Sequence, residues 1–248
     1  NKKEVLTELP DKIEQNIILP FNDEEEKIYV ANLAKANKEL QELYDLEGSD
    51  KMQILKLLTR LRQLCLEPRL VYDNIDQPSS KLKACMELIK TMQENKQKVL
   101  LFSSFTSVLD LIAEECQKAG ITYYMLTGST NKEDRRELVS RFQKDDTTVF
   151  LISLKAGGTG LNLTSAETVI HFDPWWNVSA QNQATDRAYR IGQKNNVQVF
   201  NLVMKDSVEE KIIELQKRKK ELADMFVENN SGGLSQMSKE DILSLFTM

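Results

Sequence analysis

From residue 81 onward, short and wholly apolar runs alternate with longer stretches whose apolar residues recur every three or four positions. The apolar runs are predicted strands, at 99–102, 121–126, 148–152, 168–172 and 197–203. The periodic stretches are predicted helices, at 81–94, 107–119, 131–143 and 179–189. Strands that are apolar on both faces need cover on both sides, and strands separated by helices pair in parallel. The sequence therefore predicts an α/β fold in which helices cover both faces of a parallel sheet.

The residues before 78 and after 206 follow a different pattern. An extended stretch at 13–19 is ended by Pro20, and the acidic residues after Asn22 predict the start of a helix. A second predicted helix ends at Pro68, and a charged helix occupies 207–228 before a flexible tail. These shifts predict four parts, with boundaries at 1–22, 23–77, 78–206 and 207–248.

Composition excludes several classes of protein. The chain has 248 residues, of which 41% are hydrophobic and 29% charged, as in a globular protein with a sizeable core. No apolar run approaches the roughly 20 residues of a membrane span, so we expect no membrane partner. The net charge of −5 provides no global basic field, and any contact with nucleic acid must come from a local patch.

The cysteines and the single histidine limit the metal sites, disulfides and catalytic groups that the chain can form. Cys65, Cys85 and Cys116 lie far apart with no C-x-x-C pair, which argues against a zinc site or a disulfide framework and favours a reducing compartment. His171 is the only histidine and lies within an apolar strand, so we expect a packed residue and not a catalyst. We expect no metal to be held by this chain.

Hydroxyl and glycine residues follow three of the predicted strands, at 103–106, 127–130 and 153–160. Ligands gather at the carboxyl ends of the strands in an open parallel sheet. Hydroxyls and backbone amides near helix N-termini can hold phosphate groups without much net charge. Each segment taken singly is more simply an ordinary turn. Three of them at one edge of the sheet favour a phosphate-binding rim.

Two arginines stand three residues apart in the segment QATDRAYRIGQ, which spans 183–193. On the predicted helix Arg187 and Arg190 share one face, where their guanidinium groups can clamp one anion. The alternative is a pair of surface salt bridges with Asp186 or Asp134. Spacing alone favours the salt bridges, and the motif taken by itself leaves both interpretations open.

A wider resemblance resolves this choice. The segment VFLISLKAGGTGLNLTSAETVIHFDPWWNVSAQNQATDRAYRIGQ, at 149–193, resembles motifs V and VI of the Swi/Snf-type family of helicase-like ATPases. LLFSSFTSVLDLI at 100–112 resembles the family's motif IV, and YYMLTGSTNKEDRRELVSRF at 123–142 its motif IVa. KKEVLTELPDKIE at 2–14 is similar to the segment that joins the family's two motor lobes. LTRLRQLC at 58–65 is similar to its helical insertion.

The resemblance implies a RecA-like lobe with a helical insertion on its N-terminal side and a bracing helix at its C-terminal side. It implies the second, C-terminal motor lobe of an ATP-dependent double-stranded DNA translocase that remodels or displaces DNA-bound proteins. Two departures stand out: Tyr189 occupies a position that is usually histidine, and Glu67 precedes Pro68 where the family often has His-Pro. The first leaves the arginines intact, and the second affects the helical insertion.

The sequence contains neither a G-x-x-x-x-G-K-[ST] loop nor an acidic magnesium-binding motif. The family carries both in an N-terminal RecA-like lobe, so the resemblance implies that this other lobe is the main partner and holds ATP and Mg²⁺. The start at Asn1 reads accordingly as that of a domain fragment. We therefore expect the isolated chain to be inactive as an ATPase.

The resemblance also assigns roles to individual residues. It makes Arg187 and Arg190 catalytic arginine fingers, with Arg190 the better candidate for stabilising the transition state. The nucleotide side would be formed by five residues: Gly158, Gly160, Asn162, Gln183 and Gln193. The DNA backbone would be contacted by another five: Ser104, Thr127, Ser129, Lys155 and Trp176.

Two alternative functions remain at this stage. One is a strand-separating helicase lobe of the same superfamily, and the other is a non-enzymatic module for nucleic-acid or protein interaction. No chromatin-reading segment is visible, so we expect a bacterial, cytoplasmic, nucleoid-associated protein, with a nuclear protein as the alternative.

Overall fold

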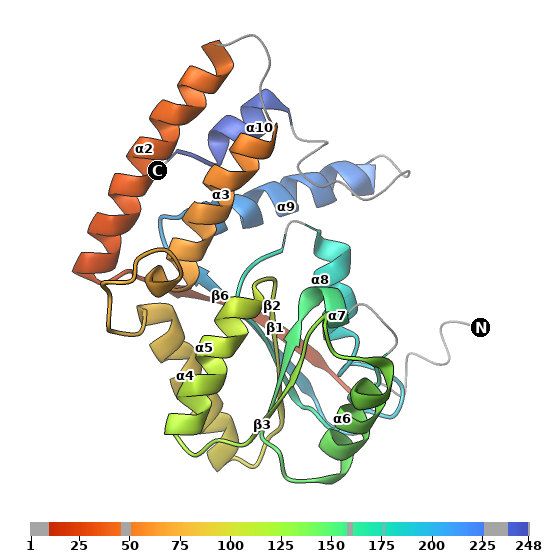
Figure 1. Cartoon of the computed structure of the whole chain (residues 1–248). Helices are drawn as coiled ribbons and strands as arrows, with labels where there is room; N and C mark the ends of the chain where they lie inside the picture. The colour runs from red at the N-terminus through yellow and green to blue at the C-terminus, as the bar shows by residue number, and fades with distance from the viewer. Residues whose placement is uncertain (1–9, 46–50, 158–160, 176, 226–237, 248) are drawn as a thin grey trace. The chain divides into compact units, whose positions relative to one another are not determined.

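A computed structural model describes residues 10–45, 51–157, 161–175, 177–225 and 238–247 (Figure 1). A six-stranded sheet has the order β1-β6-β5-β2-β4-β3. Its strands are β1 (Lys12–Leu19), β2 (Val99–Ser103), β3 (Tyr123–Leu126), β4 (Val149–Ser153), β5 (Thr168–His171) and β6 (Val197–Met204). All residues of β2, β4 and β5 are buried, as the wholly apolar runs predict.

Every strand pair of the sheet runs in parallel. The pairs β2–β4, β2–β5, β3–β4 and β5–β6 are parallel by their register. For β1 and β6, the amide of Val197 donates to the carbonyl of Asp11, and the amide of Lys205 donates to that of Leu19. The two partners advance together along the chain, so this edge pair is also parallel. The predicted α/β fold with a parallel sheet is confirmed.

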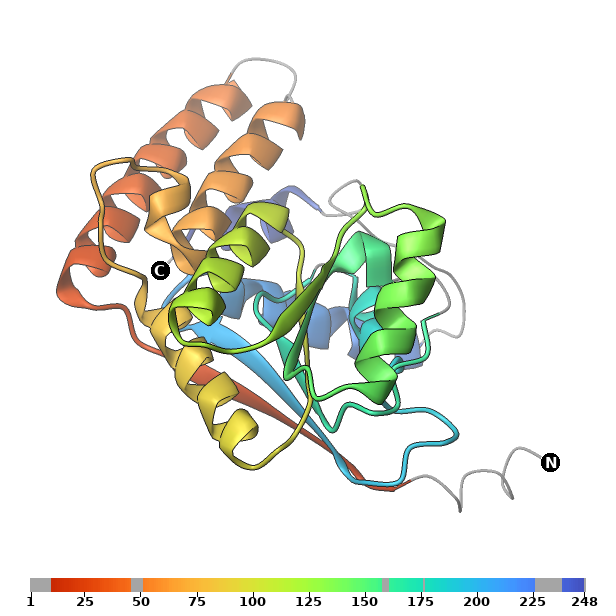
Figure 2. The same ribbon diagram turned by 60° about the horizontal axis from the view of Figure 1, so that its bottom comes forward.

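The helices around the sheet are α4 (Ser80–Glu94), α5 (Thr106–Lys118), α6 (Lys132–Lys144), α7 (Leu154–Gly157) and α8 (Val178–Thr185). Right-handed crossovers place α5 on one face, because the chain moves outward from β2 to β3, and α6 on the other, because it then returns to β4. Figures 1 and 2 show α4 beside α5 on one side of the sheet and α6 on the opposite side.

The chain divides into two compact units. The first comprises 1–17, 83–173 and 179–202, and it contains most of the sheet. The second comprises 18–82, 174–178 and 203–248, and its helices are α2 (Asp23–Asp45), α3 (Lys51–Leu66), α9 (Val208–Met225) and α10 (Lys239–Ser244), with a 3₁₀ turn at Pro68–Leu70. One hydrophobic core unites these helices, with Tyr29, Leu58 and Phe246 among its buried members. The four-part division expected from the sequence remains a prediction.

Local chemistry explains where the helices begin and end. The Asn22 side chain accepts hydrogen bonds from the amides of Glu24 and Glu25, and Glu25 accepts one from the amide of Asn22. This reciprocal cap starts α2 where the sequence predicts it. At the end of α5, Gly120 has a φ of +68°, a left-handed conformation that glycine adopts without strain.

One predicted helix is too long. The helix expected at 179–189 ends at Thr185, so Arg187 and Arg190 lie in a turn and not on one helical face. The amides of Arg187 and Ala188 donate to carbonyls three residues back, which tightens the last turn, and the carbonyl of Arg187 accepts from Leu163 of another segment. A tertiary hydrogen bond thus replaces the next turn of the helix.

Candidate functional site

The three hydroxyl-rich strand ends meet at one edge of the sheet. They border an open groove of about 620 Å³. Its lining residues are Ser104, Thr106, Asp110, Met125, Thr127, Gly128, Ser129, Ser153 and Lys155. The groove arises because β2, β4 and β3 are neighbours in the sheet, which brings the carboxyl ends of these strands together. The predicted clustering of these segments is therefore confirmed.

At the end of β2, a buried carboxylate organises the groove. Asp173 accepts hydrogen bonds from the Ser103 hydroxyl (2.7 Å), from the Ser104 amide (3.0 Å) and from the Ser104 hydroxyl. A hydroxyl has one hydrogen to donate, so Ser104 gives its own to Asp173 and presents only lone pairs elsewhere. Ser104 lines the groove, but the hydrogen of its hydroxyl is already donated to Asp173. Sequence reasoning missed Asp173, although its place directly after β5 was a usable signal.

The loop after β3 carries two further predicted DNA-contacting residues. The hydroxyls of Thr127 and Ser129 are 2.8 Å apart, and the Thr127 amide donates to the Thr130 hydroxyl (3.1 Å). Ser129 is exposed and Thr127 is half-buried. The helix α6 starts just beyond, capped by Asn131, whose side chain accepts from the amides of Glu133 and Asp134.

Lys155 supplies the positive charge of the groove. It lies on α7, directly after β4, and its side chain is exposed. Arg135 of α6 holds this short helix through a hydrogen bond to the carbonyl of Ala156 (2.9 Å). Asp110, also exposed, is the acidic residue of the groove lining. The groove thus joins one cation to several hydroxyls instead of presenting a strongly basic surface.

The arginine turn, which we define as residues 186–190, follows α8 directly. Arg187 is 8% exposed, whereas Arg190 is exposed. Burial lowers the pKa of Arg187 from its usual value, and the nearby charge of Arg190 lowers it further, with Asp186 acting in the opposite direction. The two guanidinium groups are therefore close enough to repel each other. A bound anion would relieve this repulsion.

Gln193 closes the arginine turn from its far side. Its side-chain nitrogen donates to the carbonyls of Ala166 (2.8 Å) and Ala188 (3.2 Å), and its oxygen accepts from the amides of Lys194 and Asn195. These four bonds fill the capacity of the amide. The Gln193 side chain thus holds the turn in place, and its predicted role on the nucleotide side stays a prediction.

Of the other four residues predicted for the nucleotide side, the structure describes two. Gln183 is exposed on α8, and Asn162 is exposed in a loop that Gln143 fastens through hydrogen bonds to the Asn162 carbonyl and the Ser165 amide. Gly158 and Gly160, and Trp176 of the predicted DNA side, lie outside the described residues. Their roles stay predictions.

In the second unit, side chains hold the backbone of Pro174 and Trp175 in place. Arg62 donates to the carbonyl of Pro174 (3.3 Å), and its guanidinium carbon lies 5.8 Å from the centroid of the Trp175 ring. Gln216 of α9 donates to the carbonyl of Trp175. Trp175 therefore packs within this unit.

The second unit also holds an ion pair that sequence reasoning missed. The Lys81 ammonium is 2.7 Å from both carboxylate oxygens of Glu209, and neither residue is exposed to solvent. Glu209 further accepts from the amide of Met204 (2.8 Å). Cys65 lies in the same cluster, where burial and then the Glu209 charge raise the pKa of its thiol well above the usual value. That thiol is an inert, structural group.

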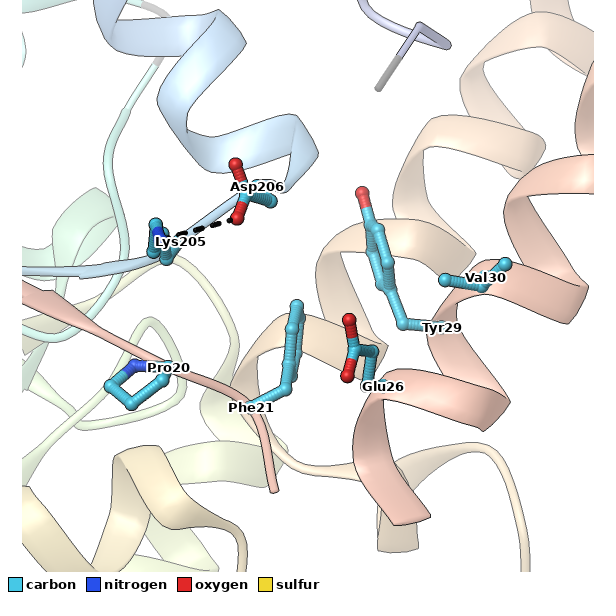
Figure 3. A pocket seen from close by; sticks show the side chains of 7 residues that line it. All are labelled: Pro20, Phe21, Glu26, Tyr29, Val30, Lys205 and Asp206. Atoms are coloured by element: carbon cyan, nitrogen blue, oxygen red, sulfur yellow. Dashed lines mark ion pairs between the residues drawn. The ribbon is translucent and has the colours of Figure 1, made fainter. Parts of the chain in front are cut away.

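A smaller cavity of about 190 Å³ opens where the chain enters α2 and leaves β6. Figure 3 shows the Phe21 and Tyr29 rings on one side of it, and Lys205 paired with Asp206 on the other. Glu26 also lines the cavity, and the lining includes no cysteine, histidine, serine or threonine. We assign no chemistry to this cavity.

The described residues contain no group of three or more His, Cys, Asp or Glu side chains placed to hold a metal ion. In the same part of the chain, no helix combines the length and the apolar character that crossing a membrane requires.

Comparisons with known proteins point to one family. The profile of the helicase conserved C-terminal domain matches residues 80–192, and that of the SNF2-related domain matches residues 1–70. An uncharacterized ATP-dependent helicase of Mycoplasma pneumoniae is 37% identical over 99% of this chain and 24% of its own length. The chain spans about a quarter of the length of the curated relatives it matches.

Solved structures give the same result. The SWI2/SNF2 ATPase C-terminal domain of Sulfolobus solfataricus has a TM-score of 0.76 and 28% identity, covering 95% of this chain and 98% of that one. The SWI2/SNF2 ATPase core of the same organism, in complex with dsDNA, has a TM-score of 0.77 and 30% identity, covering 98% of this chain and 52% of that one.

Proposed function

Since this chain belongs to the SNF2-related family, with a helicase C-terminal domain of RecA-like fold, we propose that it is the C-terminal motor lobe of an ATP-dependent double-stranded DNA translocase. It supplies arginine fingers and contacts to the DNA backbone. A second, N-terminal lobe binds ATP and Mg²⁺. The complete motor moves along duplex DNA and displaces or remodels proteins bound to it.

The arginine turn is the observation that carries this proposal. Arg187 and Arg190 are close enough for the charge of one to disfavour that of the other. Such a pair is costly by itself and favourable next to a polyanion. Arg187 is buried and therefore fixed, while Arg190 is exposed and can reach out from this lobe. This is the arrangement expected of a residue that acts on a nucleotide held by another lobe.

In the proposed mechanism, Arg190 approaches the γ-phosphate of ATP when the two lobes close. Its guanidinium group stabilises the negative charge that spreads over the equatorial oxygens as the phosphoryl group passes to water. Such a finger typically accounts for about 10³–10⁵ of the rate. Hydrolysis removes the contact and lets the lobes separate, so that ATP turnover is coupled to alternating grip on the DNA.

The groove supports the DNA side of the proposal. Lys155 and the hydroxyls of Thr127 and Ser129 lie at the rim of the sheet, where they can contact sugar and phosphate groups. Contacts to the backbone carry no base sequence, which suits a motor that steps along any duplex. A related ATPase core whose structure was solved together with dsDNA is consistent with this use of the fold.

The test is the substitution Arg190→Ala in the complete, two-lobed protein. We expect DNA-stimulated ATP hydrolysis to fall by at least about 10³-fold, because the transition-state charge loses its partner. Binding of duplex DNA should stay within about twofold, since Arg190 is not among the residues that line the groove. ATP turnover by phosphate release and DNA affinity by anisotropy are the two measurements.

Arg136→Ala is the matched control, because it removes an arginine from the surface of α6 and should leave turnover unchanged. Loss of DNA binding with retained ATPase in Arg190→Ala would reverse the assignment of roles. Turnover of ATP by the isolated chain would contradict the proposed division of labour. Displacement of a DNA strand by the complete protein would favour a strand-separating helicase instead.

A further inference from the structure

A chain of buried polar side chains lies directly behind the arginine turn. His171, the last residue of β5, is 1% exposed, and its Nε2 is 2.9 Å from the hydroxyl of Thr185. Thr185 is 3% exposed and is the last residue of α8. The arginine turn begins at the next residue. The end of one sheet strand is thus bonded to the point from which both arginines extend.

The hydrogen-bond pattern fixes the direction of this contact. The Thr185 hydroxyl donates to the carbonyl of Gln181 (3.3 Å), and we assign its oxygen as the acceptor of the imidazole N–H. His171 therefore carries its hydrogen on Nε2. Burial lowers the pKa of His171 to about 4, which keeps the ring neutral and maintains this single donor at physiological pH. The Phe102 ring stacks on the imidazole at 5.7 Å and holds its plane.

A second tether holds α8 one turn earlier. The side-chain nitrogen of Gln181 donates to the side-chain oxygen of Asn201 on β6 (3.0 Å). The nitrogen of Asn201 in turn donates to Glu14 (3.1 Å) and Asn16 (2.9 Å) of the edge strand β1. Three strands of the sheet, β1, β5 and β6, are therefore connected by side chains to this helix.

The helix depends on such tethers. At eight residues α8 is too short to be rigid by its own backbone hydrogen bonds. The arginine turn is built on its last residue, because the amides of Ala188 and Tyr189 both donate to the carbonyl of Thr185. A shift or rotation of Thr185 is therefore passed directly to Arg187 and Arg190.

We propose that Thr185 is a positioning residue for the arginine fingers, set in place by the hydrogen bond from His171. The inference rests on the proposed function, because it assigns to this buried contact the placement of groups that act on ATP. Neither residue touches the nucleotide. Their hydroxyl–imidazole bond fixes the end of α8 relative to the sheet, and a displacement of about 1 Å at such a site can cost a hundredfold in rate.

The test uses the complete protein and the pair Thr185→Val and Thr185→Ser. Valine keeps the shape and removes the hydroxyl, whereas serine keeps the hydroxyl. We expect Thr185→Val to lower the DNA-saturated kcat by about 10- to 100-fold. KM for ATP and the affinity for DNA should stay within about twofold, because this contact is absent from both binding surfaces. Thr185→Ser should retain most of the activity.

His171→Phe provides the second arm, since it removes the donor and keeps a ring against Phe102. The same loss of kcat is expected. The double variant with Thr185→Val should lose no more than either single variant, because both substitutions break one bond. Losses that multiply, or equal losses for valine and serine at 185, would show a packing effect and overturn the inference.

Arg190→Ala in the same assay distinguishes a failure of the positioning role from a failure of the proposed function. If Arg190→Ala abolishes turnover and Thr185→Val behaves as wild type, the positioning role is wrong and the proposed function stands. If Arg190→Ala retains turnover, both are wrong. A melting temperature of Thr185→Val close to that of the wild type, with the lowered kcat, supports the positioning role.

Discussion

At the scale of single residues, the site is governed by which hydrogen-bonding groups are already used. Asp173 uses the hydroxyl hydrogen of Ser104, and Gln193 uses its whole amide on backbone groups, one of them the Ala188 carbonyl of the arginine turn. Of the described residues predicted to contact DNA, Thr127, Ser129 and Lys155 keep a group that can turn toward a phosphate. The number of polar residues at a site therefore overstates the number available to a ligand.

His171 gives the pH dependence of stability a definite sign. Burial lowers its pKa from 6.5 to about 4, while Glu14 and Asp173 partly oppose the shift. Between these pH values the unfolded chain binds the proton and the folded chain does not, so the free energy of unfolding falls as pH drops from 6.5 toward 4. The loss is on the order of 3 kcal/mol.

Urea unfolding of this chain at several pH values between 4 and 7 measures the effect. The variant His171→Gln cannot titrate, so its free energy of unfolding should fall less over that interval, by the same amount of about 3 kcal/mol. Curves that run parallel for both proteins would show that His171 is not held neutral by burial.

The residue types at the site could be predicted from the sequence, but their bonds could not. The family resemblance named Ser104 and Gln193, and the apolar surroundings indicated a packed His171. The partners of these residues, such as Asp173 and Thr185, come from other elements of the fold. Their distances depend on tertiary packing, which no local pattern encodes.

At the scale of elements, the sheet was predictable because each strand is apolar on both faces. The strands at 99–103, 149–153 and 168–171 fall within about a residue of the apolar runs, as expected where burial decides the structure. The end of α8 was not predictable from residue type. Ala188 and Arg190 favour a helix, but the hydrogen bond from Leu163 to Arg187 ends it.

The buried ion pair between α4 and α9 is the element-scale feature with the largest expected energetic effect. Replacing Glu209 by Gln leaves the Lys81 ammonium buried without a countercharge, and this should destabilise the chain by about 3–5 kcal/mol. The double variant Lys81→Met with Glu209→Leu removes both charges, so it should recover much of this loss. Denaturant midpoints measure all three proteins.

Exposed pairs are the matched control for the buried one. Arg141 and Glu137 on α6 form an exposed pair at 2.5 Å, and Glu137→Gln should change stability by less than about 1 kcal/mol. A similarly small effect of Glu209→Gln would mean that water reaches the buried pair.

At the scale of the whole molecule, the net charge is −5, yet the proposed partner is a polyanion. Attraction must therefore be local, and the groove at the sheet edge has one lysine among its lining residues. We therefore expect the lobe to bind DNA weakly by itself and to gain affinity when a second lobe adds contacts on the same duplex. The charge of the sequence predicts a local contact, and the groove is the surface we propose for it.

Salt dependence of DNA binding by the complete protein tests which groove residues contact phosphates. Each phosphate contact by a cation contributes about 0.9 to the slope of log K against log salt concentration. Lys155→Ala should therefore weaken binding on all sequences alike and reduce the slope by about 1. Thr127→Ala should weaken binding without changing the slope, because a hydroxyl displaces no counterion.

Ser104→Ala tests whether a hydroxyl that lines the groove but is bonded to Asp173 contributes to DNA binding. Because the Ser104 hydroxyl donates to Asp173, its removal should leave both the slope and the affinity for DNA nearly unchanged. If Ser104→Ala instead weakened binding as much as Thr127→Ala, the hydroxyl would have to leave Asp173 when DNA binds. In that case the Asp173 carboxylate would lose a donor each time the protein binds DNA.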